Sequence, residues 1–152
     1  AALSRPELIS ELAALYGSQP VVVAIDAKGT FDLRGRFAVF SRSGTTDAGR
    51  HAVEWARGAA DRGAGEILLT SIDRDGTRAG FDCALTAAVS TAVDIPVIAS
   101  GGAGSPDHFL EVFTEGRADA ALAASIFHFA EHSVMSMKTY LASHGVPMRL
   151  TC

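Results

Sequence analysis

Residues 95–106 read IPVIASGGAGSP, and this stretch decides the fold class. The apolar run from Ile95 to Ala99 is typical of a strand buried on both faces of a parallel sheet. A glycine-rich loop, Ser100 to Gly104, follows the run, and Ser105-Pro106 then supplies a helix cap with proline at the first helical position. A strand, a loop and a helix start in direct succession indicate a βα unit.

The same succession recurs on both sides of this stretch. Short apolar runs predict strands at 21–25, 66–71, 95–99 and 119–123. Apolar residues at helical spacing predict helices that begin at about 4, 47, 82, 105 and 133. Residues 29–41 alternate loosely and predict a small hairpin. Ser4 to Glu7 has the form of a capping box for the leading helix.

Strands that alternate with helices require right-handed crossovers and therefore a parallel sheet. Because no linker or low-complexity segment divides the chain, we expect residues 1–152 to form one α/β domain with a leading helix at about 4–16. A complete (β/α)8 barrel takes ~250 residues. The expected fold is therefore half of such a TIM barrel, built from four parallel βα units.

The composition excludes several classes of protein. With 13 Lys+Arg against 17 Asp+Glu and scattered basic residues, nucleic-acid binding is not expected. The longest aliphatic run, 21–25, is far shorter than the ~20 residues of a membrane span. No signal peptide is recognised and Cys83 and Cys152 form no disulfide framework, so we expect a cytoplasmic protein with reduced thiols. The chain begins at Ala1, which favours a processed chain or a piece of a longer protein.

Glycine-rich or polar clusters follow all four predicted strands, where the active site of a barrel lies. Ser100 to Gly104 precedes a helix start, so its backbone N–H groups can bind a phosphate, although a tight turn that binds nothing fits the glycines equally well. Ala124 and Ser125 follow the last strand and favour phosphate binding, because a short extra helix there commonly completes such a site. Gly76 offers another backbone N–H.

Two carboxylates at the same edge are candidates for acid–base chemistry. Asp26 directly follows five apolar residues and is placed to act as a general acid or base, although a loop-capping surface aspartate is at least as common. Asp75 is the second candidate, whereas Asp73 behind it is better interpreted as a loop brace. Thr70 and Ser100 either bond a substrate or are satisfied buried hydroxyls.

A metal site is not predicted. His128 and His132 are four residues apart, but no third ligand follows at a suitable spacing. The sequence therefore predicts neither a metal nor a cofactor.

Four long motifs carry a family resemblance: Val22–Lys28, Gly63–Thr77, Ile98–Gly104 and Ala120–Phe129. In this order they resemble the C-terminal half of the cyclase subunit of imidazole glycerol phosphate synthase, from histidine biosynthesis. The resemblance extends from Ser4 to Leu150 and implies a (β/α)8 barrel whose strands five to eight this chain supplies. It also implies a lyase that uses ammonia from a glutaminase subunit. The products are imidazole glycerol phosphate and an aminoimidazole carboxamide ribonucleotide, formed from a phosphoribulosyl-formimino nucleotide.

The resemblance also implies roles for individual residues. Asp26 matches one of the two catalytic aspartates of the family. Asp75 matches a substrate-contacting position and is kept as the second candidate catalytic residue. Thr70 and Ser100 match substrate-contacting positions, and Glu66 matches a charged gate residue at the ammonia entrance. The positions implied for one substrate phosphate are Gly76, Gly101, Gly102, Ala124 and Ser125.

Half a barrel has physical consequences for assembly. Four strands of an opened barrel leave two unpaired edges and expose side chains that would otherwise fill the interior. We therefore expect a homodimer, or pairing with the missing N-terminal half. Three functions follow: a cyclase active once completed, a phosphate-binding half-barrel scaffold without turnover, and the sister isomerase of the pathway. Residues 72–76 and 123–125 favour the cyclase over the isomerase.

Overall fold

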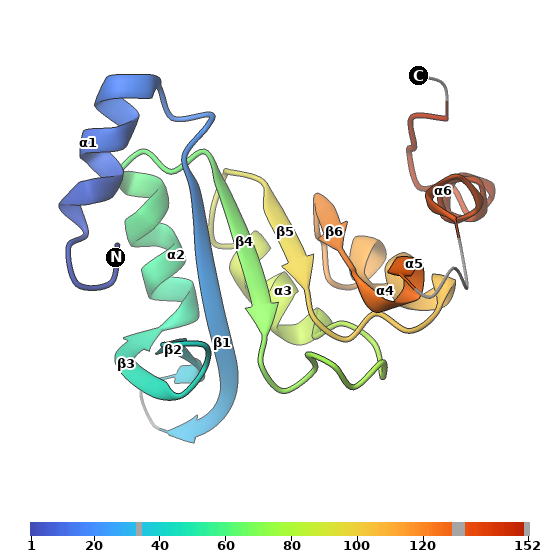
Figure 1. The fold of residues 1–152 in the computed structure, drawn as a ribbon, viewed down its shortest axis with the longest axis horizontal. Helices are drawn as coiled ribbons and strands as arrows, with labels where there is room; N and C mark the ends of the chain where they lie inside the picture. Colours follow the sequence, from blue (N-terminus) through green and yellow to red (C-terminus); the bar gives the residue numbers. More distant parts are fainter. Residues whose placement is uncertain (33–34, 129–132, 151–152) are drawn as a thin grey trace.

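The computed structural model describes residues 1–32, 35–128 and 133–150, and Figure 1 shows their arrangement. The strands form one six-stranded sheet in the order β3-β2-β1-β4-β5-β6. The strands are β1 Val22–Asp32, β2 Gly35–Ser41, β3 Thr46–His51, β4 Glu66–Ser71, β5 Val97–Ser100 and β6 Ala120–Leu122. The helices are α1 Glu7–Tyr16, α2 Ala52–Asp61, α3 Cys83–Ser90, α4 Pro106–Thr114, α5 Ser125–His128 and α6 Val134–Ser143.

The parallel part of the sheet agrees with the sequence prediction. β1, β4, β5 and β6 pair in parallel and in chain order, and a helix connects each to the next. The bounds of β4 coincide with the predicted strand at 66–71. The result is an α/β fold with a mostly parallel sheet, consistent with part of a TIM barrel.

The hairpin region is larger than predicted. β1 continues to Asp32 and pairs antiparallel with β2, which in turn pairs with β3. The helix expected from about 47 begins only at Ala52, so that prediction of its start is wrong. The physical reason is a local turn: the Asp47 carboxylate accepts a hydrogen bond from the Gly49 N–H at 2.7 Å, and Gly49 has a φ of 65°. A left-handed residue cannot continue a right-handed helix.

The predicted capping box of the leading helix is also wrong. The Ser4 hydroxyl donates to the Ala1 carbonyl at 2.9 Å, and α1 starts after Pro6 without a side-chain cap. Because Ser4 lies inside a preceding turn, its side chain is committed there. A capping box is present instead on α6, where the Ser133 and Ser136 side chains each accept a bond from the other's backbone N–H.

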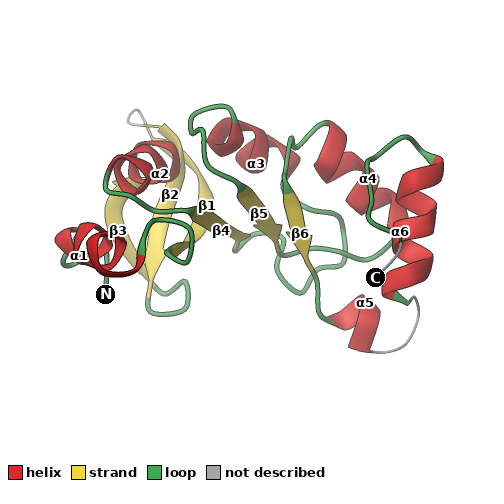
Figure 2. Cartoon of the chain, turned by 90° about the horizontal axis from the view of Figure 1, so that it is seen from above, coloured by secondary structure: helices red, strands yellow, loops and turns green. Residues whose placement is uncertain are grey.

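The core lies between one face of the sheet and the helices. Figure 2 shows α2, α3 and α4 along this face. Alternate strand residues point into it, and Ile25, Ile67, Leu69 and Val97 are at most 1% exposed. The large helix residue Trp55 packs in the same cluster. Period-two burial is what fixes the register of these strands.

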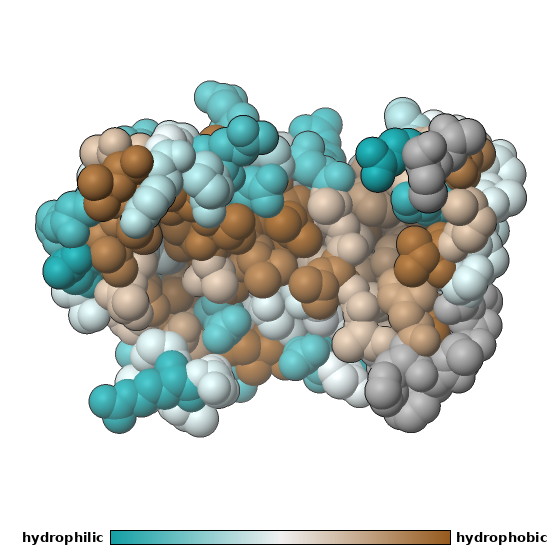
Figure 3. Space-filling view, turned by 45° about the horizontal axis from the view of Figure 1, so that its top comes forward, coloured by the Kyte–Doolittle hydropathy of each residue, from teal (hydrophilic) through white to brown (hydrophobic). Residues whose placement is uncertain are grey.

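The other face of the sheet consists of residues aligned in rows by the strand register. One row is Ala24, Leu68, Ile98 and Ala120, all paired across neighbouring parallel strands. At its two sides the face is open, because Val22 is 49% and Leu122 is 47% exposed. Figure 3 shows the apolar residues of the molecule as a brown band across this view. Such rows are the layers that fill a barrel interior when the sheet closes.

The two predicted free edges differ in the structure. β2 pairs with β1 from Asp26 onward, so the expectation of a wholly open edge on this strand is wrong for its carboxyl half. The amino half of β1, residues 22–25, has no register partner on that side among the described residues. β6 ends the sheet on the other side. The hairpin therefore protects the edge close to Asp26 and leaves the far end open.

Candidate functional site

Three polar side chains stand side by side at the carboxyl ends of the parallel strands. Asp26 pairs with Thr70, and Thr70 pairs with Ser100, across β1, β4 and β5. Residues in register on parallel strands project to the same face, which here is the face opposite to that of the buried neighbours Ile25, Leu69 and Ala99. The sequence expectation that these residues share one edge of the sheet is confirmed.

Two cavities adjoin this row. One, of about 330 Å³, is lined by Asp26, Thr70, Asp75, Ser43, Gly44 and Ile72. We call it the carboxylate cavity. The second, of about 200 Å³, is lined by Asp75, Gly76, Arg78, residues 100–103 and residues 122–124, and we call it the glycine cavity. Asp75 lines both, so the two cavities adjoin at this residue.

The glycine cavity is built from backbone that only glycine permits. Gly101 and Gly102 have φ values of 95° and 100° and are buried. A Cβ on Gly102 would lie 2.1 Å from the Gly80 carbonyl oxygen, and one on Gly101 would lie 2.9 Å from the Ser71 carbonyl oxygen. The loop then enters α4 at Pro106. A glycine-rich loop that runs into a helix start is the type of backbone that forms a phosphate cradle in other proteins.

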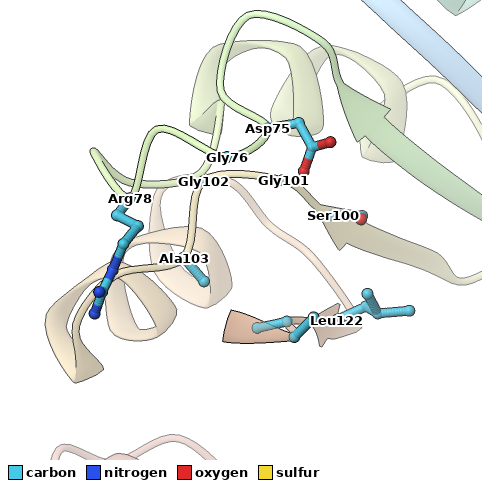
Figure 4. A pocket seen from close by; sticks show the side chains of 10 residues that line it. Asp75, Gly76, Arg78, Ser100, Gly101, Gly102, Ala103 and Leu122 are labelled. Carbon is cyan, nitrogen blue, oxygen red and sulfur yellow. The ribbon is translucent and has the colours of Figure 1, made fainter. Parts of the chain in front are cut away.

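Charge is distributed unevenly around the glycine cavity. Figure 4 shows the Asp75 carboxylate on the side of Ser100, and the Arg78 side chain at the opposite end of the glycine loop. The guanidinium of Arg78 suits the anionic group of a ligand. The carboxylate of Asp75 suits the part of the same ligand at which protons are transferred. Sequence reasoning did not single out Arg78, although its position after the Asp-Gly-Thr loop was the available signal.

The turn between β2 and β3 forms a wall of the carboxylate cavity. Ser43 and Gly44 line it, and Gly44 is so close to Ile72 that an added Cβ would lie 3.2 Å from the Ile72 Cδ1 atom. Arg42 and Ser43 hold left-handed φ values of 51° and 56°. Ser43 and Gly44 were not predicted as part of the site, because a sequence that indicates a hairpin does not reveal where the turn of that hairpin packs.

Comparison with known proteins identifies the family. The model of the histidine biosynthesis protein family matches residues 1–133. The chain belongs to this family. It is also 62% identical over 152 residues to the imidazole glycerol phosphate synthase subunit HisF of Acidobacterium capsulatum. The alignment covers 100% of this chain and 59% of the relative, so the chain spans little more than half the length of that protein. The resemblance drawn from the four motifs is confirmed.

Four further residues considered in the sequence of this histidine biosynthesis chain lie in three different parts of the structure. Ala124 lines the glycine cavity, and Ser125 follows it as the first residue of α5. Glu66 lies at the opposite end of β4, where it pairs with Val22, so it is separate from both cavities. Asp73 braces the loop after β4 by accepting a hydrogen bond from the Gly29 N–H at 2.7 Å.

The described part of the chain contains neither a metal-ion cluster nor a membrane-spanning helix. Among residues 1–32, 35–128 and 133–150, no three His, Cys, Asp or Glu side chains are grouped so that they could hold a metal ion. Of the two histidines considered from the sequence, His132 lies outside the described residues. In the part of the chain that the structure describes, no helix has the length and apolar character needed to cross a membrane.

Proposed function

We propose that this chain supplies the catalytic groups of the C-terminal half of an imidazole glycerol phosphate synthase cyclase. In this proposal the chain catalyses the reaction once its sheet is completed to a barrel. The observation that carries this proposal is the pair of adjoining cavities, which place a carboxylate pair next to a glycine cradle. The 62% identity to a HisF subunit supports the same assignment. The substrate class is a phosphoribulosyl-formimino nucleotide, and the nitrogen donor is ammonia.

In this proposal one substrate phosphate occupies the glycine cavity. Backbone N–H groups of Gly76, Gly101 and Gly102, with those of Ala124 and Ser125, bind the phosphate oxygens. Arg78 contributes positive charge at the end of the loop away from Asp75. Because the peptide groups are held by positive-φ glycines, the cradle is formed before the ligand arrives.

The reacting end of the substrate lies in the carboxylate cavity. Ammonia condenses with the substrate ketone and one water is lost, which requires a proton to be delivered to the departing oxygen. The new imine nitrogen then attacks the formimino carbon, the bond from that carbon to the aminoimidazole side breaks, and the aminoimidazole carboxamide ribonucleotide leaves as an amine that gains a proton. Loss of a proton from the carbon beside the former ketone completes the aromatic imidazole ring. We assign these transfers to Asp26, assisted by Asp75, with Thr70 and Ser100 as hydrogen-bonding contacts.

Ammonia is proposed to enter from the opposite end of the sheet. Glu66 sits at the amino end of β4, in the row that begins the open face. A charged residue at this end can gate a path along the face toward Asp26. The proposed source of ammonia is a glutaminase subunit that docks at the amino ends of the strands.

We further propose that residues 1–152 form one half-barrel domain, which a second copy completes. The free amino half of β1 in one copy would pair with β6 of the other, so that two such contacts close the sheet. A cavity of about 490 Å³ beside β6, lined by apolar residues such as Ile98, Phe109 and Leu141, offers room for side chains of an added strand. Closure would cover the exposed Leu122 and bring two copies of Asp26 into one interior.

The experiment is cyclase turnover with added ammonium, read together with the solution mass from light scattering. A dimer that forms both products, and loses turnover in Asp26→Asn, supports the proposal. Asp61→Asn, on the exposed end of α2, is the matched control and should retain turnover. Addition of the N-terminal half of the relative tests the alternative completion. If neither the chain alone nor its mixture with the N-terminal half shows turnover, the proposal that it is an enzyme is refuted.

One second function has its own supporting observation. The whole glycine cradle comes from β4, β5 and β6 and the segments that follow them, so phosphate binding needs no second chain. A folded monomer that binds phosphate without turnover would therefore indicate a phosphate-binding scaffold. Turnover of the sister isomerase substrate in place of the cyclase substrate would assign the third function considered from the sequence.

A further inference from the structure

The ladder between β1 and β4 ends in an unusual way. The two strands pair from Val22 with Glu66 to Ala27 with Ser71, and the Ile72 N–H then donates to the Ala27 carbonyl at 2.9 Å. Here β4 leaves the sheet, because the Asp75 N–H turns back to the Ser71 carbonyl at 2.9 Å. β1 nevertheless continues to Asp32.

A side chain supplies the next rung of this ladder. The Gly29 N–H donates to Asp73 Oδ2 at 2.7 Å, across 44 positions of sequence. The carboxylate thus occupies the place of the backbone carbonyl that β4 no longer provides. The fit is close, since a Cβ on Gly29 would lie 3.2 Å from the same oxygen. A hydrogen bond from a backbone N–H to an ionised carboxylate is roughly twice as strong as a neutral one.

This rung connects the two backbone segments that carry the candidate carboxylates. Asp26 lies three residues before Gly29 on β1, and Asp75 lies two residues after Asp73 in the loop. Both Asp26 and Asp75 line the carboxylate cavity, whereas Asp73 is not among the described residues that line either cavity. A hydrogen bond made outside the cavity thus joins the two segments that carry the pair.

We infer that Asp73 is a positioning residue, whose carboxylate holds the loop after β4 against β1 and so sets the separation of Asp26 and Asp75. This inference rests on the proposed function for its catalytic consequence, and on the hydrogen bond alone for its structural one. Asp73 acts through the two carboxylates and does not contact the substrate. Its loss should therefore lower kcat more than it changes KM.

The test compares Asp73→Ala with Asp73→Asn. Both substitutions remove the charge, but only asparagine retains an oxygen that can accept from Gly29. Since a displacement of about 1 Å can cost about a hundredfold in rate, we expect alanine to lower kcat by about ten- to a hundredfold and asparagine by about threefold or less. KM should stay within about twofold of wild type in both, because most of the glycine cavity is formed by residues 100–103 and 122–124, which Asp73 does not hold.

Thr77→Val is the control for a general loosening of this loop. The Thr77 hydroxyl donates to the Arg74 carbonyl at 2.7 Å and accepts from the Ala79 N–H at 3.2 Å, without lining either cavity. This variant should keep the kcat of wild type. If alanine and asparagine behave alike at position 73, or if Thr77→Val loses as much rate as Asp73→Ala, the inference is overturned.

A measurement that needs no turnover separates this inference from the proposed function. In protein with 13C-labelled aspartate, the side-chain chemical shifts of Asp26 and Asp75 are recorded at neutral pH in the three variants. The asparagine and alanine variants carry equal charge, so a difference between their chemical shifts reports a changed arrangement of the pair. Identical spectra would overturn the positioning role, whereas a wild-type protein without turnover would overturn only the proposed function.

Discussion

Replacing two glycines of the glycine cavity by alanine should give unequal losses of stability. Gly76 has a φ of 74°, and an added Cβ there would meet nothing within 4 Å. Gly102 has a φ of 100°, and an added Cβ would lie 2.1 Å from the Gly80 carbonyl oxygen and 2.8 Å from the Gly80 carbonyl carbon. The first substitution tests backbone conformation alone, and the second tests conformation together with close packing.

The magnitudes follow from these contacts. A non-glycine residue in the left-handed region costs about 1–2 kcal/mol, so Gly76→Ala should lower the free energy of unfolding by about that amount. In Gly102→Ala the two loops must also move apart by more than about 1 Å, since carbon and oxygen in contact need over ~3 Å. That movement breaks the bond from the Gly80 N–H to the Gly102 carbonyl, now 2.8 Å long. With about 1–3 kcal/mol for the buried group left unpaired, added to the cost of the left-handed conformation, the total is about 2–5 kcal/mol.

Thermal melting with and without millimolar phosphate measures both effects. In a domain of this size 1 kcal/mol moves Tm by about 2–4 °C, so we expect a loss of about 2–8 °C for Gly76→Ala and about 4–20 °C for Gly102→Ala. Phosphate that binds only the folded chain raises Tm, and Gly102→Ala should abolish that rise. Gly49→Ala, with a φ of 65° and open space around its Cβ, should match Gly76→Ala in stability and keep the full response to phosphate. Equal losses in the two cavity variants, or an unchanged phosphate response in Gly102→Ala, would refute the reasoning.

Three further predictions concern single side chains. Arg42→Gly and Ser43→Gly should each raise the free energy of unfolding by up to about 1 kcal/mol through relieved backbone strain, which melting measures. Only Ser43→Gly should weaken substrate binding in calorimetry, since only Ser43 lines the carboxylate cavity. Tyr140→Phe removes the hydroxyl's hydrogen bond to Asp107 between α6 and α4 and should lower Tm at neutral pH. That bond raises the pKa of Tyr140 above its ordinary 10.0, so the advantage of wild type should be present below pH 10.0 and disappear as pH rises through the higher folded value, in melts recorded against pH. Burial, with nearby carboxylates, raises the pKa of the Cys83 thiol above 9.0, so mass spectrometry should find alkylation at this residue slower than in a model peptide at pH 8.

The sequence predicted the repeating units because their signals are local. The residues of the strand at 66–71 alternate between the core and the open face, and the predicted bounds of this strand are those of the structure. The helix predicted near Asp82 begins at Cys83, where the Asp82 carboxylate accepts from the Leu85 N–H at 3.0 Å. In each case the residues that determine the element lie within a few positions of one another in the sequence.

The features that were missed depend on contacts between distant segments. Ser43 reaches the carboxylate cavity because Gly44 packs on Ile72, and Asp73 bonds to Gly29 rather than to its own loop. No periodicity or spacing encodes such contacts, since they appear only when β1 and β4 are already paired. The helix start at 47 was misplaced for the opposite reason, because an aspartate turn of three residues outweighed a longer apolar pattern.

The two cavities lie at different distances from the open edge of the sheet. We therefore expect phosphate binding by the chain alone and turnover only by the completed barrel. The glycine cavity lies among the segments that follow β4, β5 and β6, so every backbone group that would bind phosphate comes from one copy. The carboxylate cavity lies at β1, beside the strand edge whose amino half is unpaired. Completion of the barrel would therefore change the surroundings of Asp26 while leaving Gly102 as it is. Phosphate affinity should be independent of protein concentration, whereas turnover should rise with the fraction of assembled protein, and a turnover rate per chain that stays constant on dilution to monomer would contradict this division.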